Sequence, residues 1–387
     1  MAEWQTVRLG EIVKTNQSTY SPKENWQFVN YLDTGNITMN KIDEIQNINT
    51  AKDKMPSRAR RKVKTNSIIY STVRPNQLHY GIIKKQPDNF LVSTGFTVID
   101  VNYDKAVPDF IYYALTKQEV TEQLQAIAEQ SVSAYPSLKP SDIENLELML
   151  PDKKTQERIV AILRSIDEKI KENNAINNNL EQQAQTIYQQ MFIDNARSDW
   201  AEGTLSDIAD ITMGQSPSGS SYNEDGTGTI FFQGRAEFGF RFPSVRLYTT
   251  EPKRMAQSND TLMSVRAPVG DLNVAHMDCC IGRGLAAIHS KSHHQSFVLY
   301  TMFSLKKQLD VFNGEGTVFG SINRNSLNDM PILIPSDDIL DEFERIVAPM
   351  DLTIRNNYDE NCRLQDIRDT LLPRLMSGEL DVSDIDI

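Results

Sequence analysis

Cysteine is scarce in this chain of 387 residues, and the positions of the cysteines do not suggest a disulfide framework. Cys279, Cys280 and Cys362 are too few and too unevenly spaced for disulfide pairs or a zinc site, so we expect reduced thiols in a cytoplasmic protein. Long apolar runs are also missing, since none approaches the roughly 18–20 residues that a membrane-spanning helix needs. The first residues, MAEWQTVRLGEIV, lack the basic-then-apolar order of a signal peptide.

Catalytic motifs are absent as well. No GxxxxGK followed by Ser or Thr occurs, so the Gly/Ser-rich segment 214–229 is predicted to be a surface loop and not a phosphate-binding loop. His293 and His294 are adjacent, which does not suit joint ligation of a metal. The chain contains no Pro-Pro, which excludes the Asp-Pro-Pro-Tyr motif of amino-methylating enzymes. We therefore predict a non-catalytic chain with no metal or cofactor of its own.

The net charge of -12 argues at first against a nucleic-acid partner, but the charge is unevenly distributed. Residues 1–151 carry 17 Lys and Arg against 17 Asp and Glu, whereas residues 337–387 carry 5 against 14. A neutral first domain with a local basic run can bind phosphate even when the tail is acidic. The net charge therefore does not decide the partner.

An internal repeat organises the sequence. WQTVRLGEIVK at Trp4 has a counterpart, WAEGTLSDIAD, at Trp200, and NSIIYSTVRP at Asn66 resembles NDTLMSVRAP at Asn259. Each half then reaches an apolar strand-like run that ends in proline, followed by a segment containing Glu-Arg-Ile-Val, at Glu157 and again at Glu344. Several matched words in the same order divide the chain into two halves, about 1–195 and 196–387.

The pattern of apolar and polar residues in each half changes at this proline. Before it, short β-branched and aromatic runs alternate with turn residues, which predicts strands and loops, with helix-like exceptions at 107–128 and 296–312. After it, apolar residues recur at steps of three and four, as in a coiled coil. The members of the first seam are Ile159, Leu163, Ile166, Ile170, Asn173, Ile176, Leu180, Ala184, Ile187 and Met191; those of the second are Phe343, Val347, Met350, Ile354, Asn357, Leu364, Ile367, Leu371 and Leu375.

Each long helix needs a partner for its apolar stripe, and the other helix is the simplest one. Asn173 and Asn357 hold similar places, and a polar seam residue commonly fixes register. The alternative for NNAINNNLEQQAQ is a flexible Asn/Gln-rich linker. Pro349 is expected to kink or break the second helix.

The predicted fold class is α+β, with two globular domains alternating with two long helices that pair as an antiparallel coiled-coil-like stalk. The predicted boundaries are 1–151 and 196–336 for the domains, 152–195 and 337–378 for the helices, and 379–387 for an acidic tail. A helix of 40 residues would be roughly 60 Å long.

What remains is recognition chemistry. The run KDKMPSRARRKVK (52–64) carries seven basic residues and one acid. The matched segments STVRPNQLHYG (71–81) and SVRAPVGDLN (264–273) carry further hydrogen-bond donors. Arginine can contact phosphate or bind guanine through two hydrogen bonds, and Asn or Gln can do so with adenine. The alternative for each arginine is a surface ion pair. The predicted DNA-binding residues are Arg58, Arg60, Arg61, Lys62, Arg74, Asn76, Gln77, Tyr80, Tyr135, Lys139, Gln233, Arg235, Arg266, Arg283, Asn323 and Arg324.

Over almost its whole length this pattern resembles the specificity (S) subunit of Type I restriction–modification enzymes. The resemblance rests on the repeated Trp…Leu opening with Ser21-Pro22 and Ser216-Pro217, on the SVR-type strand and on the proline before each helix. Gln156-Glu157 and Phe343-Glu344 stand where the family usually has Glu-Gln, and Pro349 is a further departure.

The resemblance implies that each domain recognises one half of a split DNA site and that the helices set the spacer. It further implies two methyltransferase (M) subunits with S-adenosylmethionine, which methylate adenine N6, and restriction (R) subunits that use ATP and Mg for cleavage. The partner-binding residues implied on the helices are Ile159, Leu163, Ile166, Ile170, Leu180, Ile187, Phe343, Val347, Leu364, Leu371 and Leu375. Two alternatives remain open: a two-domain DNA-binding regulator or scaffold that dimerises through the stalk, and a hydrolase without a recognisable motif.

Overall fold

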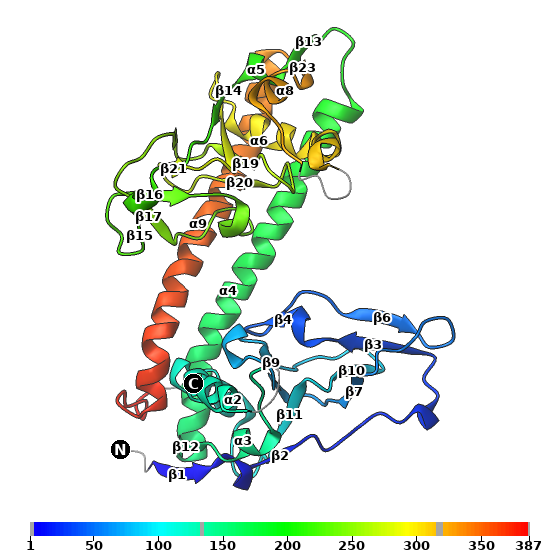
Figure 1. Cartoon of the computed structure of the whole chain (residues 1–387), viewed down its shortest axis with the longest axis vertical. Helices are drawn as coiled ribbons and strands as arrows, with labels where there is room; N and C mark the ends of the chain where they lie inside the picture. The colour runs from blue at the N-terminus through cyan, green and yellow to red at the C-terminus, as the bar shows by residue number, and fades with distance from the viewer. Residues whose placement is uncertain (1–3, 132–134, 315–319, 386–387) are drawn as a thin grey trace. The chain divides into compact units, whose positions relative to one another are not determined.

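The structure, a computed structural model, describes residues 4–131, 135–314 and 320–385. The chain forms two compact units, of which unit 1 comprises Met1–Ile170 with Cys362–Ile387 and unit 2 comprises Lys171–Asn361 (Figure 1). Each unit contains one domain of mixed strands and helices together with parts of both long helices, α4 (Lys153–Tyr188) and α9 (Asp337–Met376). The predicted α+β class with two domains and two long helices is confirmed.

Unit 1 is built on two four-stranded sheets. The first has the strand order β2-β11-β8-β9, and the second has the order β6-β3-β10-β7, in which β3 and β10 are parallel. The elements are β1 (Gln5–Arg8), β2 (Val13–Thr15), β3 (Phe28–Leu32), β4 (Ile37–Thr38), β5 (Lys41–Ile42), β6 (Gln46–Asn49), β7 (Ala59–Lys62), β8 (Ile68–Ser71), β9 (Tyr80–Ile82), β10 (Phe90–Ser93), β11 (Phe96–Val101), α1 (Pro108–Leu115), α2 (Gln118–Glu129), α3 (Pro140–Glu144) and β12 (Glu147–Leu150).

Side-chain alternation along β8 shows how the two sheets pack. Ile69 belongs to a core shared with Leu32 of β3 and Phe96 of β11, so this core lies between the sheets. Ile68 and Tyr70 point to the opposite face, into a core that also holds α1 and α2 and the unit's parts of α4 and α9. A strand whose successive side chains are apolar on both faces is buried on both faces, as the run Ile68-Ile69-Tyr70 indicates.

Unit 2 repeats this plan. Its order β14-β22-β19-β20 corresponds to β2-β11-β8-β9, and its parallel pair β16–β21 corresponds to β3–β10, so the predicted internal repeat is confirmed. The elements are β13 (Ala201–Thr204), α5 (Leu205–Ile208), β14 (Ala209–Met213), β15 (Tyr222–Asn223), β16 (Thr229–Phe232), β17 (Leu247–Thr249), β18 (Met255–Ala256), β19 (Thr261–Ser264), β20 (Leu272–Val274), β21 (Cys279–Ile281), β22 (Leu285–Ser290), α6 (Gln295–Ser304), α7 (Lys306–Asp310), α8 (Arg324–Asn328) and β23 (Pro331–Ile334).

Each domain ends at an antiparallel strand pair, β1 with β12 and β13 with β23, directly before the proline that precedes the long helix. Ile159 and Phe343 stand at the same distance after Pro151 and Pro335, and both side chains are fully buried. Ile346 of the second Glu-Arg-Ile-Val is only partly buried. The two Glu-Arg-Ile-Val words are therefore displaced from each other by three residues along the helical repeat, whereas the junctions at Pro151 and Pro335 are equivalent.

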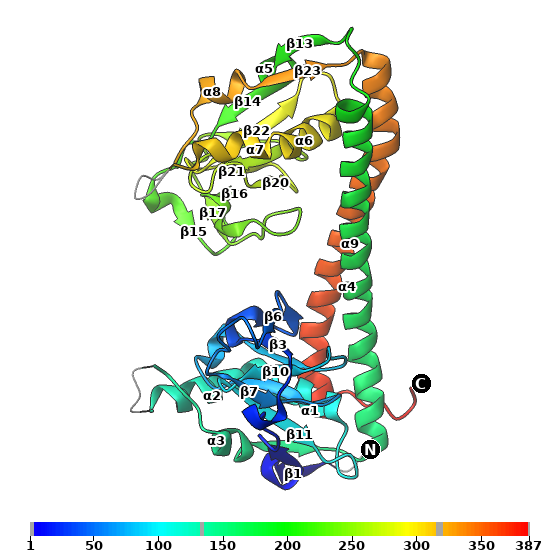
Figure 2. The same cartoon turned by 90° about the vertical axis from the view of Figure 1, so that its right-hand side faces the viewer.

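The two long helices contact each other in antiparallel order within each unit, and Figure 2 shows them side by side. In unit 1, Arg368 of α9 lies 3.3 Å from Asp167 of α4. In unit 2, Asn173 Nδ2 donates to Asn361 Oδ1 at 2.9 Å, and Asn357 Nδ2 donates to Asn177 Oδ1 at 2.8 Å. The predicted antiparallel pairing is confirmed, whereas the flexible linker is excluded because the Asn-rich segment lies inside α4.

The register of the two helices depends on four asparagines rather than on a direct Asn173–Asn357 contact. Asn173 and Asn357 are equivalent in the repeat, as are Asn177 and Asn361, and each hydrogen bond joins one member of each set. The predicted break at Pro349 does not occur, because α9 continues through it.

The prediction that the seam residues bind partner subunits needs correction. Ile159 and Leu163 lie in the core of unit 1 together with Leu375, and Phe343 and Val347 lie in the core of unit 2. Their own domains cover them, because each domain packs its first sheet and helices onto this stripe. Leu180, Ile187 and Leu371 also pack against these cores. Ile166 is buried as well, whereas Ile170 and Leu364 are partly buried. The exposed large hydrophobic side chains of the helices are Ile176, Leu352 and Ile367.

Within the described part of the chain, no helix is long and apolar enough to cross a membrane. The three cysteines are free thiols, two of them buried.

Candidate nucleic-acid interface

Four of the predicted DNA-binding residues converge in unit 2. Gln233, Arg235, Arg266 and Arg283 line one cavity of about 240 Å³. Gln233 and Arg235 follow β16, and Arg283 follows β21. Because β16 and β21 are parallel, their carboxyl ends meet at the same edge of the sheet. The segment after β19 brings Arg266 to the same place.

Glycines allow the backbone to form the wall of this cavity. A Cβ atom on Gly282 would lie 2.9 Å from both Cα and the carbonyl oxygen of Gln233, which is closer than real Cβ atoms approach. Gly284 is similarly close to Gln233 and Gly234. The Gly282 N–H donates to the Phe232 carbonyl at 2.8 Å. Arg283 is thus fixed between two glycines at the rim while its side chain stays exposed.

Arg266 sits on a turn that hydrogen bonds hold from both sides. The Ser264 hydroxyl donates to the Arg266 carbonyl at 3.0 Å, and Arg266 forms an isolated bridge with Ser321. The next amide, that of Ala267, donates to the Gly320 carbonyl at 3.0 Å. The backbone of Arg266 is therefore fixed, whereas its side chain is exposed.

The cavity is strongly cationic. Three arginines line it, and one of them, Arg235, is paired with a carboxylate, Asp271, at 2.7 Å. Among the described residues, neither Arg266 nor Arg283 has a carboxylate within ion-pair distance. A hollow with excess positive charge and an amide side chain at its rim suits a polyanion that also carries hydrogen-bonding groups.

Asn323 and Arg324 lie outside this cavity. The Asn323 side chain caps α8 by accepting from the Ser326 N–H at 2.9 Å, and Arg324 is the first residue of that helix. Both side chains are exposed. In the repeat, TVFGSINRNS (317–326) matches VSAYPSLKPSD (132–142). Residues 317–319 and 132–134 of these segments lie outside the described residues.

Topology identifies a corresponding site in unit 1. Asp33 follows β3 as Gln233 follows β16, and Thr94 follows β10 as Arg283 follows β21. An acid and a hydroxyl therefore occupy the positions that carry an amide and a guanidinium in unit 2. The two units share the arrangement of strands, and the polar side chains that follow these strands differ.

Asp33 is a candidate that the sequence prediction missed. Its carboxylate accepts from the Tyr31 hydroxyl and from the Thr34 N–H, both at 2.9 Å. Partial burial acts to raise the pKa of Asp33, but these hydrogen bonds and the nearby charge of Arg58 hold it below its ordinary value. Asp33 is thus an ionised acceptor at neutral pH. Aligning the segment after β3 with the segment after β16 would have found it.

Arg74 belongs to the same region of unit 1 but is not the equivalent of Arg266. The isolated bridges join Val73 to Ser137 and Arg266 to Ser321, so Val73 takes the place of Arg266. Although NSIIYSTVRP and NDTLMSVRAP resemble each other, their arginines are offset by one residue in the structure. Arg74 adopts a left-handed backbone with φ 48° and places its guanidinium 5.3 Å from the ring centroid of Tyr135. The neighbouring Asn76 and Gln77 are exposed.

Tyr80 does not reach the surface. Its side chain is 4% exposed and stacks on Tyr70 at 5.6 Å, with Tyr112 at 6.3 Å. The prediction that Tyr80 contacts DNA is therefore corrected, because the ring belongs to the core of unit 1.

Part of the basic run of unit 1 (52–64) forms strand β7. Arg60, Arg61 and Lys62 lie in β7, and Arg58 just before it. Lys62 pairs with Glu24 and lies 5.1 Å from the ring centroid of Trp26. The Nε atom of Arg61 is buried without a hydrogen-bond partner. Arg58 is exposed, and so is Lys139 at the start of α3.

The part of the chain that the structure describes contains no group of three or more His, Cys, Asp or Glu side chains arranged to hold a metal ion.

Comparison with known proteins gives a consistent result. Residues 1–182 and 197–358 match the family described as Type I restriction modification DNA specificity domain. The putative type I restriction enzyme MjaX specificity subunit of Methanocaldococcus jannaschii is 27% identical over an alignment of 404 positions. This alignment covers 98% of this chain and 94% of that protein. The type I restriction enzyme HindI specificity subunit of Haemophilus influenzae is 26% identical over 465 residues, spanning 98% of this chain and 100% of that protein.

Among solved structures, the S subunit of a Type-I restriction-modification system from M. genitalium is similar in fold. It has a TM-score of 0.62 at 16% identity, covering 99% of this chain and 97% of its own.

Proposed function

The chain belongs to the Type I restriction modification DNA specificity domain family, and on this premise we propose that its two units each recognise one half of a bipartite, asymmetric DNA site. The chain supplies DNA sequence specificity and is not itself a catalyst. The observation that carries the proposal is the cavity of unit 2, where Gln233, Arg235, Arg266 and Arg283 converge from three separate segments.

The chemistry of this cavity fits a base edge bordered by phosphates. Arginine presents a planar fork of donors that matches the two acceptors of guanine, and it also binds phosphate. The Gln233 amide has both a donor and an acceptor, as adenine requires. Unit 1 offers a different set, with Asp33 as acceptor and Arg74 as donor. Two sites with one frame and different groups suit two half-sites of unlike sequence.

For the complex around this chain we propose two M subunits and R subunits as partners, with cytoplasmic DNA as the substrate. S-adenosylmethionine, ATP and Mg would be held by those partners, which would methylate adenine N6 and cleave DNA, and this chain would hold no cofactor. The paired helices would set the spacer between half-sites. Because the seam is covered by the chain's own domains, the exposed side chains Ile176, Leu352 and Ile367 are better candidates for docking.

Mapping of methylated adenines in the host genome tests the proposal. The expected result is a split motif that disappears when the gene for this chain is deleted and returns when the gene is restored. An Arg283→Ala chain should then alter the letters of one half of the motif and leave the other half unchanged. A motif that survives the deletion, or a variant that changes both halves together, would overturn the proposal.

A further inference from the structure

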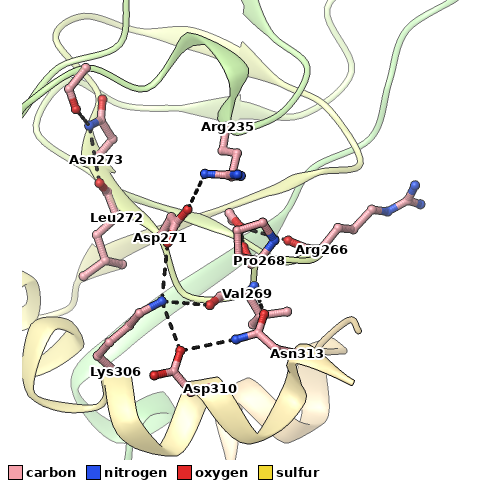
Figure 3. A network of polar contacts seen from close by, with 12 residues as sticks. Arg235, Arg266, Pro268, Val269, Asp271, Leu272, Asn273, Lys306, Asp310 and Asn313 are labelled. Carbon is pink, nitrogen blue, oxygen red and sulfur yellow. Dashed lines mark hydrogen bonds and ion pairs between the residues drawn. The ribbon is translucent and has the colours of Figure 1, made fainter. Parts of the chain in front are cut away.

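Arg235 differs from the other arginines of the cavity because a chain of charged side chains holds it (Figure 3). Its Nη1 lies 2.7 Å from Asp271 Oδ2. The other oxygen of Asp271, Oδ1, lies 3.4 Å from Lys306 Nζ, and Lys306 Nζ lies 3.2 Å from Asp310 Oδ1. A series of ion pairs, in which positive and negative side chains alternate, therefore links Arg235 to helix α7.

The far end of this chain is fixed to the backbone. Lys306 Nζ donates to the Val269 carbonyl at 3.1 Å. Asn313 donates to Asp310 Oδ1 at 3.2 Å and accepts from the Val269 N–H. Asp271, directly before β20, thus has a cation on each side, Arg235 and Lys306, and Lys306 is itself held by the Val269 carbonyl and Asp310. This arrangement limits the directions in which the Asp271 carboxylate can point.

Arg266 gives the contrast within the same view. In Figure 3 its side chain extends away from the network, and no dashed line joins its guanidinium to the other residues drawn. An exposed arginine whose side chain is not held by a carboxylate suits phosphate, whose charge can be met from many directions. A fixed arginine suits a base edge, because two parallel hydrogen bonds require a set orientation and less rotamer entropy is then lost on binding.

We propose that Arg235 recognises a guanine in the half-site of unit 2 and that Asp271 is the positioning residue that orients it. Only one guanidinium nitrogen of Arg235 is used by Asp271, so Nη2 and Nε remain to donate to O6 and N7 of the base. The inference rests on the proposed function, since it assigns a base to one position of that site.

The test is selection of binding sites from randomised duplex DNA by the tagged full-length chain, purified from its host with the subunits that accompany it. Wild type is compared with Arg235→Ala and Asp271→Asn. The Asn variant keeps the shape and removes the negative charge. Both variants are expected to lose discrimination for guanine at the same single position, by roughly 5- to 150-fold for Arg235→Ala and less for Asp271→Asn.

Glu224→Gln is the matched control, because Glu224 also pairs with an exposed arginine of unit 2, Arg246 at 3.3 Å, away from the cavity. Its selected sequence should equal that of wild type. Because exposed ion pairs contribute little to stability, Asp271→Asn should leave the Tm unchanged, which separates a positioning role from a structural one.

The outcomes separate the two proposals. If wild type selects no sequence at all, the proposed function fails. If wild type selects a split site but the half assigned to unit 2 lacks guanine, or if Asp271→Asn retains the full preference, or if the two variants relax different positions, the positioning inference is overturned while the proposed function stands.

Discussion

Removal of Arg241 should strongly destabilise unit 2. The Arg241 side chain is 5% exposed, and it lies 3.6 Å from Glu181 of α4 and 3.4 Å from Asp351 of α9. It also donates to the Tyr300 hydroxyl of α6 at 3.1 Å, and that hydroxyl donates to Asp351 at 2.9 Å. One buried cation thus neutralises two carboxylates that come from different long helices, so its loss leaves two negative charges close together.

The expected cost of Arg241→Ala is about 3–5 kcal/mol at neutral pH, because a buried ion pair has lost one partner. This is a large share of the roughly 5–15 kcal/mol that stabilises a typical domain. Native-state hydrogen exchange of α6 and of the Lys171–Tyr188 part of α4 would measure it within unit 2. A matched variant combines Arg241→Met with Glu181→Gln and Asp351→Asn; with no charge left, it should unfold within about 1 kcal/mol of wild type.

The pH dependence gives a second readout. Burial raises the pKa of Glu181 and of Asp351 above their ordinary values, while Arg241 acts to lower both. A raised carboxyl pKa means that stability is fully present below the unfolded value, roughly 4, and is lost as the pH rises through the folded value. Without Arg241 both values rise further, so the defect of Arg241→Ala should shrink as the pH falls toward about 5. A defect that is independent of pH, or absent, would refute the reasoning.

Three further predictions concern smaller changes. Asn357→Ala, which removes the partner of Asn177, should cost about 1–3 kcal/mol in urea unfolding, and replacing both by Leu should recover most of it; equal losses would contradict the pairing. Gly282→Ala should weaken DNA binding in a gel-shift assay and cost about 1–3 kcal/mol by overpacking against Gln233, whereas Gly219→Ala, with nothing within 4 Å, should do neither. Asp33→Asn should change the preference at one position of the half-site of unit 1 by about 1–3 kcal/mol in binding-site selection, and a change in the other half would refute its assignment.

The long helices could be predicted from the sequence because most seam positions, spaced three or four residues apart, are apolar, with Asn173 and Asn357 as polar members. What the seam touches could not be predicted, since an apolar stripe has the same spacing whether its own domain or another subunit covers it. Ile159 and Phe343 proved to be core residues of their own units. Pro349 was expected to kink or break the second helix, but α9 continues through it.

The candidate site could be predicted where hydrogen-bond donors are frequent in the sequence. Gln233, Arg235, Arg266 and Arg283 were identified as donors, and the segments after β16, β19 and β21 bring them together. Asp33 was missed because a search for basic residues passes over an acceptor. Tyr80 was misassigned because a tyrosine among polar residues has the same pattern whether its ring stacks on a base or on Tyr70. Only the three-dimensional neighbours decide such cases.

The correspondence between the two units has a consequence for how such chains diversify. The positions that differ between the units, Gln233 and Asp33 or Arg283 and Thr94, lie just after corresponding strand ends; Gln233, Arg283 and Thr94 are exposed, and Asp33 is partly buried. Substitutions at exposed positions usually change stability by no more than about 0.5 kcal/mol. Mutation can therefore change the recognised DNA sequence without a large loss of stability. Duplication of one ancestral half, followed by mutation of these positions, would give two domains that recognise unrelated DNA sequences.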